Sequence, residues 1–480
     1  MRRTGTRLGL VAGVFVAVVV ILAAFAVAGS ANATEPSDAP SSMPTAEPGR
    51  SAPPLPASDT ASPSGDTAAP AGTAAPAPAR KIRAIGGQNI LSEGERAIAV
   101  VTGTIGAPRK IDATGWTAGL HVDRRIAGQA EVGSTIDIAW EELSASRQVR
   151  FDEGERILAV LAPLPSQSIW KKRFPEVGTG KRVLIVADRG DAFLRSPDAT
   201  TLNSLEHYFA MVDDARNGSP GTRRLAEIAA SGDRAVALEA LGILEKRKDL
   251  AGLLGDDGTP ILLQAARAEG RDPVIRARAL LLAARSGLRG VKEAALALAE
   301  PGSPIRADAY RALGILPHGL TPEQATALLT DADPDLRAVG VALATDPARR
   351  EQVVKLARND EAAKVRVAAG ISLVMRYGAS AIPEVLPLLE DKEAVVRGGV
   401  ARAIGQLGEP GVAPLRNVVD KGSEAAALAA VAGLTRAGKE GALALKSISH
   451  LHTSDKVRAA AKLAMGEGPP KKSHHHGDEH

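Results

Sequence analysis

An aliphatic residue followed by arginine recurs through the second half of the chain at a nearly fixed interval. The first five of these arginines stand 30, 31, 29 and 31 residues apart, and the last gap of 61 residues is two periods with Ala427 in place of the missing arginine. A period near 30 residues indicates stacked pairs of helices. One pair buries too little apolar surface to fold alone, whereas stacked pairs bury both faces. Residues 221–466 are therefore predicted to form an α-helical solenoid, with these arginines along it: Arg276, Arg306, Arg337, Arg366, Arg397 and Arg458.

The repeated unit combines an acidic residue, the aliphatic–arginine step, small residues and a closing glycine, and is clearest at Asp391–Gly405. This pattern resembles the short HEAT repeats of the phycobilin-lyase type, and seven or eight units cover about half of the chain. The resemblance implies an armadillo-like superhelix in which Asp272, Asp333 and Asp391 cap the second helix of a pair. It also implies that the six arginines form a structural ladder, each reaching a neighbouring repeat. An anion-binding stripe is the functional alternative for these arginines, and bonding between repeats is the favoured interpretation.

Residues 81–200 differ from the repeats, because short β-type runs alternate here with Gly, Pro, Asp and Ser clusters. Five such runs predict a small, mostly-β domain, and their spacing favours a barrel of the oligonucleotide/oligosaccharide-binding size. All three tryptophans, Trp116, Trp140 and Trp170, lie in this region. Residues 201–220 are expected to form a connector helix, since apolar side chains recur there at helical spacing. The expected strands are Ala97–Ile105, Trp116–Ile126, Thr135–Trp140, Arg156–Leu161 and Arg182–Ala187.

The N-terminal residues 1–33 carry the features of a targeting segment. Three arginines precede an apolar run at Leu8–Ala28, and Ala31–Ala33 fits the pattern that signal peptidase reads. The run is also long enough to cross a bilayer, which takes about 20 residues. A cleaved signal and a retained single-pass anchor both fit, and the disordered Ala/Pro/Ser/Thr-rich linker expected at 34–80 favours the anchor. Basic residues before the run place the remaining chain outside the cytoplasm, in the periplasm or secreted if the signal is cleaved.

Motifs of helical-repeat enzymes are absent from the repeats. Deoxyhypusine hydroxylases hold iron with paired His-Glu motifs, but His318, His450 and His452 are not followed by glutamate. The chain contains no cysteine, which excludes thiol nucleophiles and disulfides. We therefore predict a non-enzymatic protein without a catalytic, cofactor-binding or metal site.

The C-terminal tail at 467–480 holds the weak candidates for metal ligands. Clustered imidazoles bind transition metals, but a short flexible segment has no surrounding side chains to fix a coordination geometry. A solvated tail or the remnant of an expression tag is the favoured interpretation. The candidates are His474, His475, His476 and His480.

Two functions follow from these features. The first is an extracytoplasmic interaction scaffold that binds a protein partner through the solenoid and contacts the membrane if the N-terminal helix is retained. The alternative is a module that binds an envelope polymer or oligosaccharide on the tryptophans of the β-domain, which burial of all three tryptophans would exclude. A nucleic acid partner is not expected, because 59 basic residues against 55 acidic ones give a net charge of only +4. The oligomeric state is left open.

Overall fold

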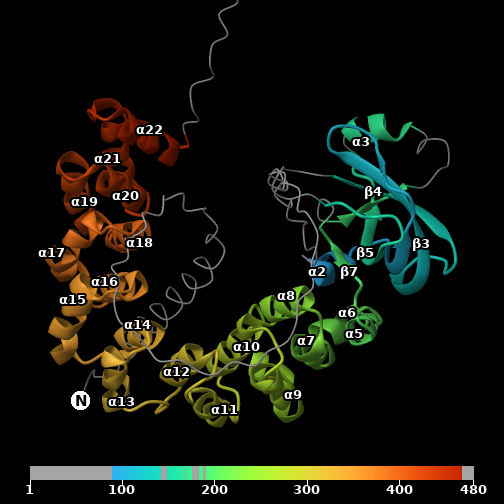
Figure 1. Ribbon diagram of the computed structural model, residues 1–480, viewed down its shortest axis with the longest axis horizontal. Coiled ribbons are helices and arrows are strands. Elements are labelled where there is room, and N and C mark those ends of the chain that lie inside the picture. Colours follow the sequence, from blue (N-terminus) through green and yellow to red (C-terminus); the bar gives the residue numbers. More distant parts are fainter. Residues whose placement is uncertain (1–88, 142–148, 167, 176–182, 188–190, 467–480) are drawn as a thin grey trace, which may run out of the picture.

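The computed structural model describes residues 89–141, 149–166, 168–175, 183–187 and 191–466. A small β-sheet region is followed by an array of helices that runs along an arc (Figure 1). The expected targeting segment, the linker and the His-rich tail lie outside the described residues.

The β-sheet region closes into a small barrel. Its strand order is β1-β3-β4-β6-β5-β7, and a further pairing of β1 with β5 completes the ring. Each of the five runs expected from the sequence overlaps one strand of this ring, and β3, β4 and β5 extend beyond the expected bounds. The short strands β2 and β7 were not expected, because two or three residues are too few to form a recognisable β-type run. The strands are β1 (Ala99–Ile105), β2 (Arg109–Lys110), β3 (Gly115–Gly128), β4 (Thr135–Glu141), β5 (Arg156–Pro163), β6 (Val183–Val186) and β7 (Phe193–Arg195).

The connector differs from the single helix expected over 201–220. Two helices form there, α5 (Ala199–Phe209) and α6 (Asp213–Asn217). Arg216 donates hydrogen bonds to carbonyl oxygens at the end of α5, and this satisfies the free C-terminus of that helix. Two aspartates open α6, where negative charge is favourable at a helix N-terminus. The interactions at the end of α5 and the start of α6 therefore outweigh the apolar spacing, which favours one continuous helix.

The helical array consists of outer and inner helices. Each inner helix from α8 onward contacts the next inner helix along the chain. In Figure 1 the inner helices line the hollow side of the arc and the outer helices lie on its outside. Many inner helices begin behind an Asp or Ser whose side chain accepts a backbone N–H, as at Asp233 and Ser423.

The outer elements are α7 (Ser219–Ser231), α9 (Leu250–Arg267), α11 (Val291–Leu298), α13 (Pro322–Ala327), η2 (Leu328–Thr330), η3 (Pro347–Arg349), α15 (Arg350–Asn359), η4 (Gly378–Ala381), α17 (Ile382–Val385), η5 (Leu386–Glu390), α19 (Glu409–Lys421) and α21 (Gly438–Leu451). The inner helices are α8 (Arg234–Leu244), α10 (Pro273–Arg285), α12 (Arg306–Ile315), α14 (Pro334–Leu343), α16 (Ala363–Tyr377), α18 (Ala394–Gly405), α20 (Glu424–Leu434) and α22 (Asp455–Ala464).

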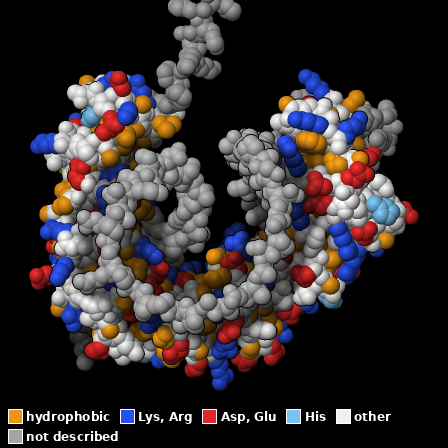
Figure 2. Space-filling model, viewed as in Figure 1, with side chains coloured by type: hydrophobic (Ala, Val, Ile, Leu, Met, Phe, Trp, Pro, Cys, Tyr) orange, Lys and Arg blue, Asp and Glu red, His pale blue; other side chains and the backbone are white. Residues whose placement is uncertain are grey.

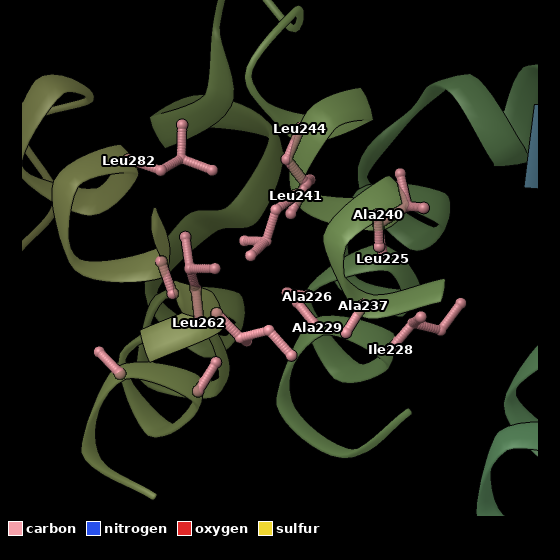
Figure 3. Close-up of a cluster of buried hydrophobic side chains, with 14 of the residues drawn as sticks. Leu225, Ala226, Ile228, Ala229, Ala237, Ala240, Leu241, Leu244, Leu262 and Leu282 are labelled. Carbon is pink, nitrogen blue, oxygen red and sulfur yellow. The ribbon is translucent and has the colours of Figure 1, made fainter. Parts of the chain in front are cut away.

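One hydrophobic core runs from the outside of the barrel into the first repeats. It joins Val100 and Leu158 of the barrel to Leu205 of α5 and then to the buried leucines and alanines of α7 to α10. Figure 3 shows that the labelled side chains of this core are small or aliphatic, which suits helices that approach closely. The barrel is thus packed onto the helices and is not a separate module on a tether.

A hydrogen-bonded contact reinforces this junction. The short helix α2 (Ile90–Gly94) precedes the barrel, and its first N–H groups point at the carboxylate of Glu239 in α8. Glu239 accepts from the backbone N–H of Leu91 and of Ser92, each at 2.9 Å. Burial raises the pKa of Glu239, although these hydrogen bonds oppose the rise. A carboxylate from the first repeat therefore caps the helix that leads into the barrel.

Among the described residues, one helical stretch, Ala363–Glu390, is apolar and long enough to cross a membrane by length and composition. It comprises α16 to η5, in the middle of the array, and 61% of its most apolar window is buried inside the protein.

Candidate interaction surface

The repeated arginines lie near the start of inner helices and close the turn that precedes each helix. Arg366 shows the arrangement most clearly, because its Nη1 donates to the carbonyl oxygens of Asp360 at 2.8 Å and Glu361 at 3.0 Å. Arg337, Arg397 and Arg458 bind the carbonyls five and six residues before them in the same way. These carbonyls follow the outer helix, where a cation is favourable.

Two of these arginines also bind the next repeat. Arg337 donates through Nε and Nη2 to the carboxylate of Asp360 at 2.8 and 2.9 Å. Arg366 binds Asp391 in the same bidentate manner at 2.7 and 2.9 Å. All four side chains are at most 11% exposed. The Arg366 hydrogen bonds lower the pKa of Asp391 against the effect of burial. For Asp360 burial is the largest influence and acts to raise the pKa, but the hydrogen bonds from Arg337 and from the N–H of Ala362, together with the charges of Arg337 and Arg366, lower the pKa overall.

The other arginines of the ladder use different partners. Arg276 and Arg306 each donate Nε to a carbonyl oxygen, that of Ala266 and that of Ala299, both at 3.0 Å. Arg458 pairs with Asp455, three residues away on its own helix. The ladder of ion pairs between repeats is therefore confined to its middle.

The structure confirms two of the three caps that the resemblance implies. Asp272 and Asp333 accept backbone N–H groups at the start of α10 and α14. Asp391 is not a cap, because α18 begins at Ala394 with Glu393 in the cap position. Asp391 lies six residues before its arginine, whereas the true caps lie four residues before theirs. It accepts the N–H of Glu393 within the preceding turn, which orients its carboxylate toward Arg366.

A line of uncharged side chains follows the ladder on the inner helices. The residue after each repeated arginine, or after Ala427, is turned by about 100° around the helix and is partly or fully exposed. Each inner helix contacts outer helices on one side and neighbouring inner helices on two others. These positions lie on the remaining side, which faces the hollow. We call this line the inner stripe, and its members are Ala277, Ala307, Ala338, Val367, Gly398, Leu428 and Ala459.

Charged side chains beside the inner stripe are paired between neighbouring inner helices. Lys364 of α16 binds Asp335 of α14 at 2.8 Å, and Lys456 of α22 binds Glu424 of α20 at 2.8 Å. Hydrophobic and basic side chains both reach the floor of the hollow in Figure 2. The hollow side therefore presents the uncharged inner stripe, and ion pairs neutralise part of the charge beside it.

The tryptophans of the barrel do not form one exposed platform. Trp140 is fully buried, and its Nε1 donates to the carbonyl oxygen of Val149 at 3.0 Å. Trp170 of α3 (Ser168–Arg173) is 2% exposed and stacks on Phe174. Trp116 is partly buried and stacks on Trp140, with ring centroids 6.4 Å apart. These rings are engaged in packing within the barrel region. The sequence alone could not show whether they would pack inside or be exposed on the surface.

A cleft of about 380 Å³ opens beside Trp170. The guanidinium of Arg173 lies 4.8 Å from the centroid of the Trp170 ring, and it binds the Asp112 carboxylate at 2.7 and 3.0 Å and Glu141 at 2.6 Å. These bonds hold the pKa of Asp112 at about 2. The acidic groups here are thus engaged by a fixed cation and are not poised as an acid or base. The cleft is lined by Leu164, Pro165, Ser166, Trp170, Lys171, Phe174 and Pro175.

Residues 351–435 match the family model for HEAT repeats. The chain contains HEAT repeats. The matched segment runs from α15 to the end of α20 and holds Arg366, Arg397 and three members of the inner stripe.

Solved structures similar to the chain include the following three. Human deoxyhypusine hydroxylase in complex with glycerol is 14% identical, with 52% of this chain and 96% of that chain covered and a TM-score of 0.27. Kap121p is 15% identical over 54% of this chain and 35% of that chain, with a TM-score of 0.31. An engineered protein is 16% identical over 52% of this chain and 78% of that chain, with a TM-score of 0.26. No curated protein matches the chain by sequence.

No group of three or more metal-ligating side chains is present within the described ranges. His318 offers its backbone carbonyl to Lys292, and His452 is engaged by Ser454 and Val419 through its two ring nitrogens. The candidate ligands His474, His475, His476 and His480 lie outside the described residues. The absence of an enzymatic site remains a prediction from the sequence.

Proposed function

We propose that this chain is a non-enzymatic scaffold outside the cytoplasm that binds a protein partner along the hollow side of its HEAT repeats. The observation that carries the proposal is the inner stripe, an uncharged and accessible line that continues over seven successive inner helices. A partner that lays an apolar segment along this line would bury it without leaving a charge unpaired. The proposal includes that the repeats are of the short HEAT type and that they stack into a superhelix.

The composition of the repeats supports contacts of moderate affinity. Large aromatic side chains dominate the energy of tight interfaces, but Tyr310 and Tyr377 are the aromatic residues between 221 and 466. Tyr377 is already stacked under the Arg350 guanidinium at 4.3 Å. Binding would therefore depend on many small contacts spread over the repeats.

The barrel is proposed to act as a fixed support at one end of the repeats. Its core continues into α7 and α8, and α2 is capped by Glu239. Polymer binding on the tryptophans is the less favoured function, because Trp140 and Trp170 are buried.

The test is cross-linking in intact cells with a reagent that does not cross membranes. Gly398→Glu and Leu428→Glu place charges on the inner stripe, while Leu296→Glu places the same charge on the outer helix α11, where Leu296 is 45% exposed. Point variants are preferred to deletion of the repeats, since deletion would expose the core shared with the barrel.

One partner protein recovered from the wild type and the Leu296→Glu variant, and lost from both stripe variants, would support the proposal. Equal recovery from all four chains would overturn the assignment of the stripe. A chain that becomes cross-linked only after cell lysis would overturn the location outside the cytoplasm.

A further inference from the structure

The junction between α12 and α14 is held together differently from the two junctions that follow it along the array. Those two are bridged by the bidentate ion pairs of Arg337 and Arg366. At the junction of α12 with α14, the polar contacts of α11, α12 and their loops stay on their own side, and those of α13 and of the turn before α14 stay on the other. Among the described residues, no hydrogen bond or ion pair joins residues 291–320 to residues 321–466.

The apolar core is also interrupted at this junction. The buried cluster that begins in the barrel ends at Leu313 of α12, and the buried side chains of α13, η2 and α14 belong to other clusters. The two inner helices meet where Gly314 leaves room for the side chain of Leu343. Apolar contact has no preferred direction, so the angle between the helices can change while this contact is kept. The preceding junction, from α10 to α12, is different because one buried cluster runs through it.

The groups for a further ion pair are present on the two sides of this junction. Asp331 follows η2 as Asp360 follows α15 and Asp391 follows η5. Each of these three carboxylates accepts the backbone N–H of the residue two positions later. In the two later repeats the carboxylate is bound by the ladder arginine of the preceding inner helix. For Asp331 that arginine is Arg306 of α12.

Arg306 is turned toward its own repeat in this structure. Its Nε donates to the carbonyl oxygen of Ala299 at 3.0 Å, and its guanidinium lies 5.8 Å from the centroid of the Tyr310 ring. Both Arg306 and Asp331 are partly exposed. An aspartate would offer the guanidinium two hydrogen bonds and an opposite charge. The pair that holds the later repeats together is therefore available here and is not formed.

We propose that the junction between α12 and α14 is a hinge, and that Arg306 and Asp331 form the latch that closes it. In the closed state the Arg306 guanidinium leaves Ala299 and binds the Asp331 carboxylate, so that ion pairs link every repeat from α12 to α18. The hinge lies between Ala307 and Ala338 of the inner stripe, and closure changes the curvature of the hollow side. The effect of closure on a partner rests on the proposed function, whereas the hinge itself does not.

Pairs of spin labels test the hinge, because the chain contains no cysteine of its own. Glu293→Cys with Lys355→Cys places labels at exposed positions of the outer helices α11 and α15, on the two sides of the hinge. Lys355→Cys with Asn417→Cys, on α15 and α19, spans the same number of repeats without the hinge and is the control. Double electron–electron resonance on the full chain in detergent should give two distance populations for the first pair and one for the control. Equal distributions in the two pairs would overturn the hinge.

Asp331→Asn, added to the first label pair, tests the latch. The amide oxygen can still accept the N–H of Asp333, so the turn before α14 is kept and only the charge is removed. One of the two populations should be lost, and high salt should deplete the same population in the chain without this substitution.

Asp333→Asn is the matched control for the latch, because it removes a charge two residues away and keeps an acceptor for the N–H of Asp335. Both populations should persist in it. Persistence of both populations in Asp331→Asn, or an equal loss in Asp333→Asn, would refute the latch. These distances are measured without a partner, so either failure leaves the scaffold proposal standing.

Discussion

Replacing Asp391 by alanine tests how the middle repeats are held together. The substitution removes the carboxylate that receives two hydrogen bonds from Arg366, and the arginine side chain that remains is only 6% exposed. It also removes the acceptor for the N–H of Glu393 in the turn before α18. The two losses act on one contact, that between α16 and α18.

The magnitude follows from the burial of the pair. Breaking a buried ion pair by removing one member costs about 3–5 kcal/mol, because the other charge is left without compensation. Two carbonyl oxygens still bind Arg366 after the change, so we expect a value toward the lower end, roughly 3 kcal/mol. The matched control is Asp455→Ala, whose carboxylate is 90% exposed and should cost less than about 1 kcal/mol.

Urea unfolding followed by far-ultraviolet circular dichroism measures both free energies. A third variant, Arg366→Met with Asp391→Leu, replaces both charges by apolar groups and should be less destabilised than Asp391→Ala alone. An Asp391→Ala variant as stable as Asp455→Ala would refute the reasoning, and so would a double variant that is no better than the single one.

Three further predictions concern titration, helix contact and the barrel junction. The pKa of Asp391 is lower in the folded chain than in the unfolded chain. The wild type is therefore more stable than Asp391→Asn above the unfolded pKa of about 4, and it loses this extra stability as the pH falls through the pKa of the folded chain. Urea midpoints of both chains at successively lower pH should converge. Gly405→Ala should destabilise by about 1–3 kcal/mol, since its Cβ would lie 2.0 Å from a carbonyl oxygen of α20. Gly398 lies on the same helix as Gly405, but a Cβ at Gly398 would have no atom of its surroundings within 4 Å. Gly398→Ala should therefore stabilise the chain by about 0.5–1 kcal/mol in the same urea assay. Glu239→Ala should leave the N–H of Leu91 unbound, and hydrogen exchange at that amide should accelerate relative to amides within the barrel.

Periodic features were within reach of the sequence because they depend on local backbone geometry. The 30-residue spacing located the helix pairs, and short β-type runs separated by turn-forming residues located the five strands of the barrel ring. The resemblance to short HEAT repeats implied the caps, and it holds for aspartates four residues before their arginines, such as Asp272, because capping involves groups close in sequence. The break between α5 and α6 was missed, since its energy lies in the end groups around Arg216 and not in the apolar spacing.

The sequence alone determined the stacked helical repeats and the small β-region before them, because a 30-residue period permits few structures and β-type runs between turn-forming residues mark strands. The tertiary structure decided which charges find partners. Six arginines look alike in the chain, yet Arg337 and Arg366 meet a carboxylate of the next repeat while Arg397 does not. It also decided that Trp140 lies in a core and that Glu239 caps a helix near the start of the barrel. The contacts of Arg337, Arg366 and Glu239 join groups 23 to 148 residues apart in the chain, which only the packing of the repeats and the barrel brings together.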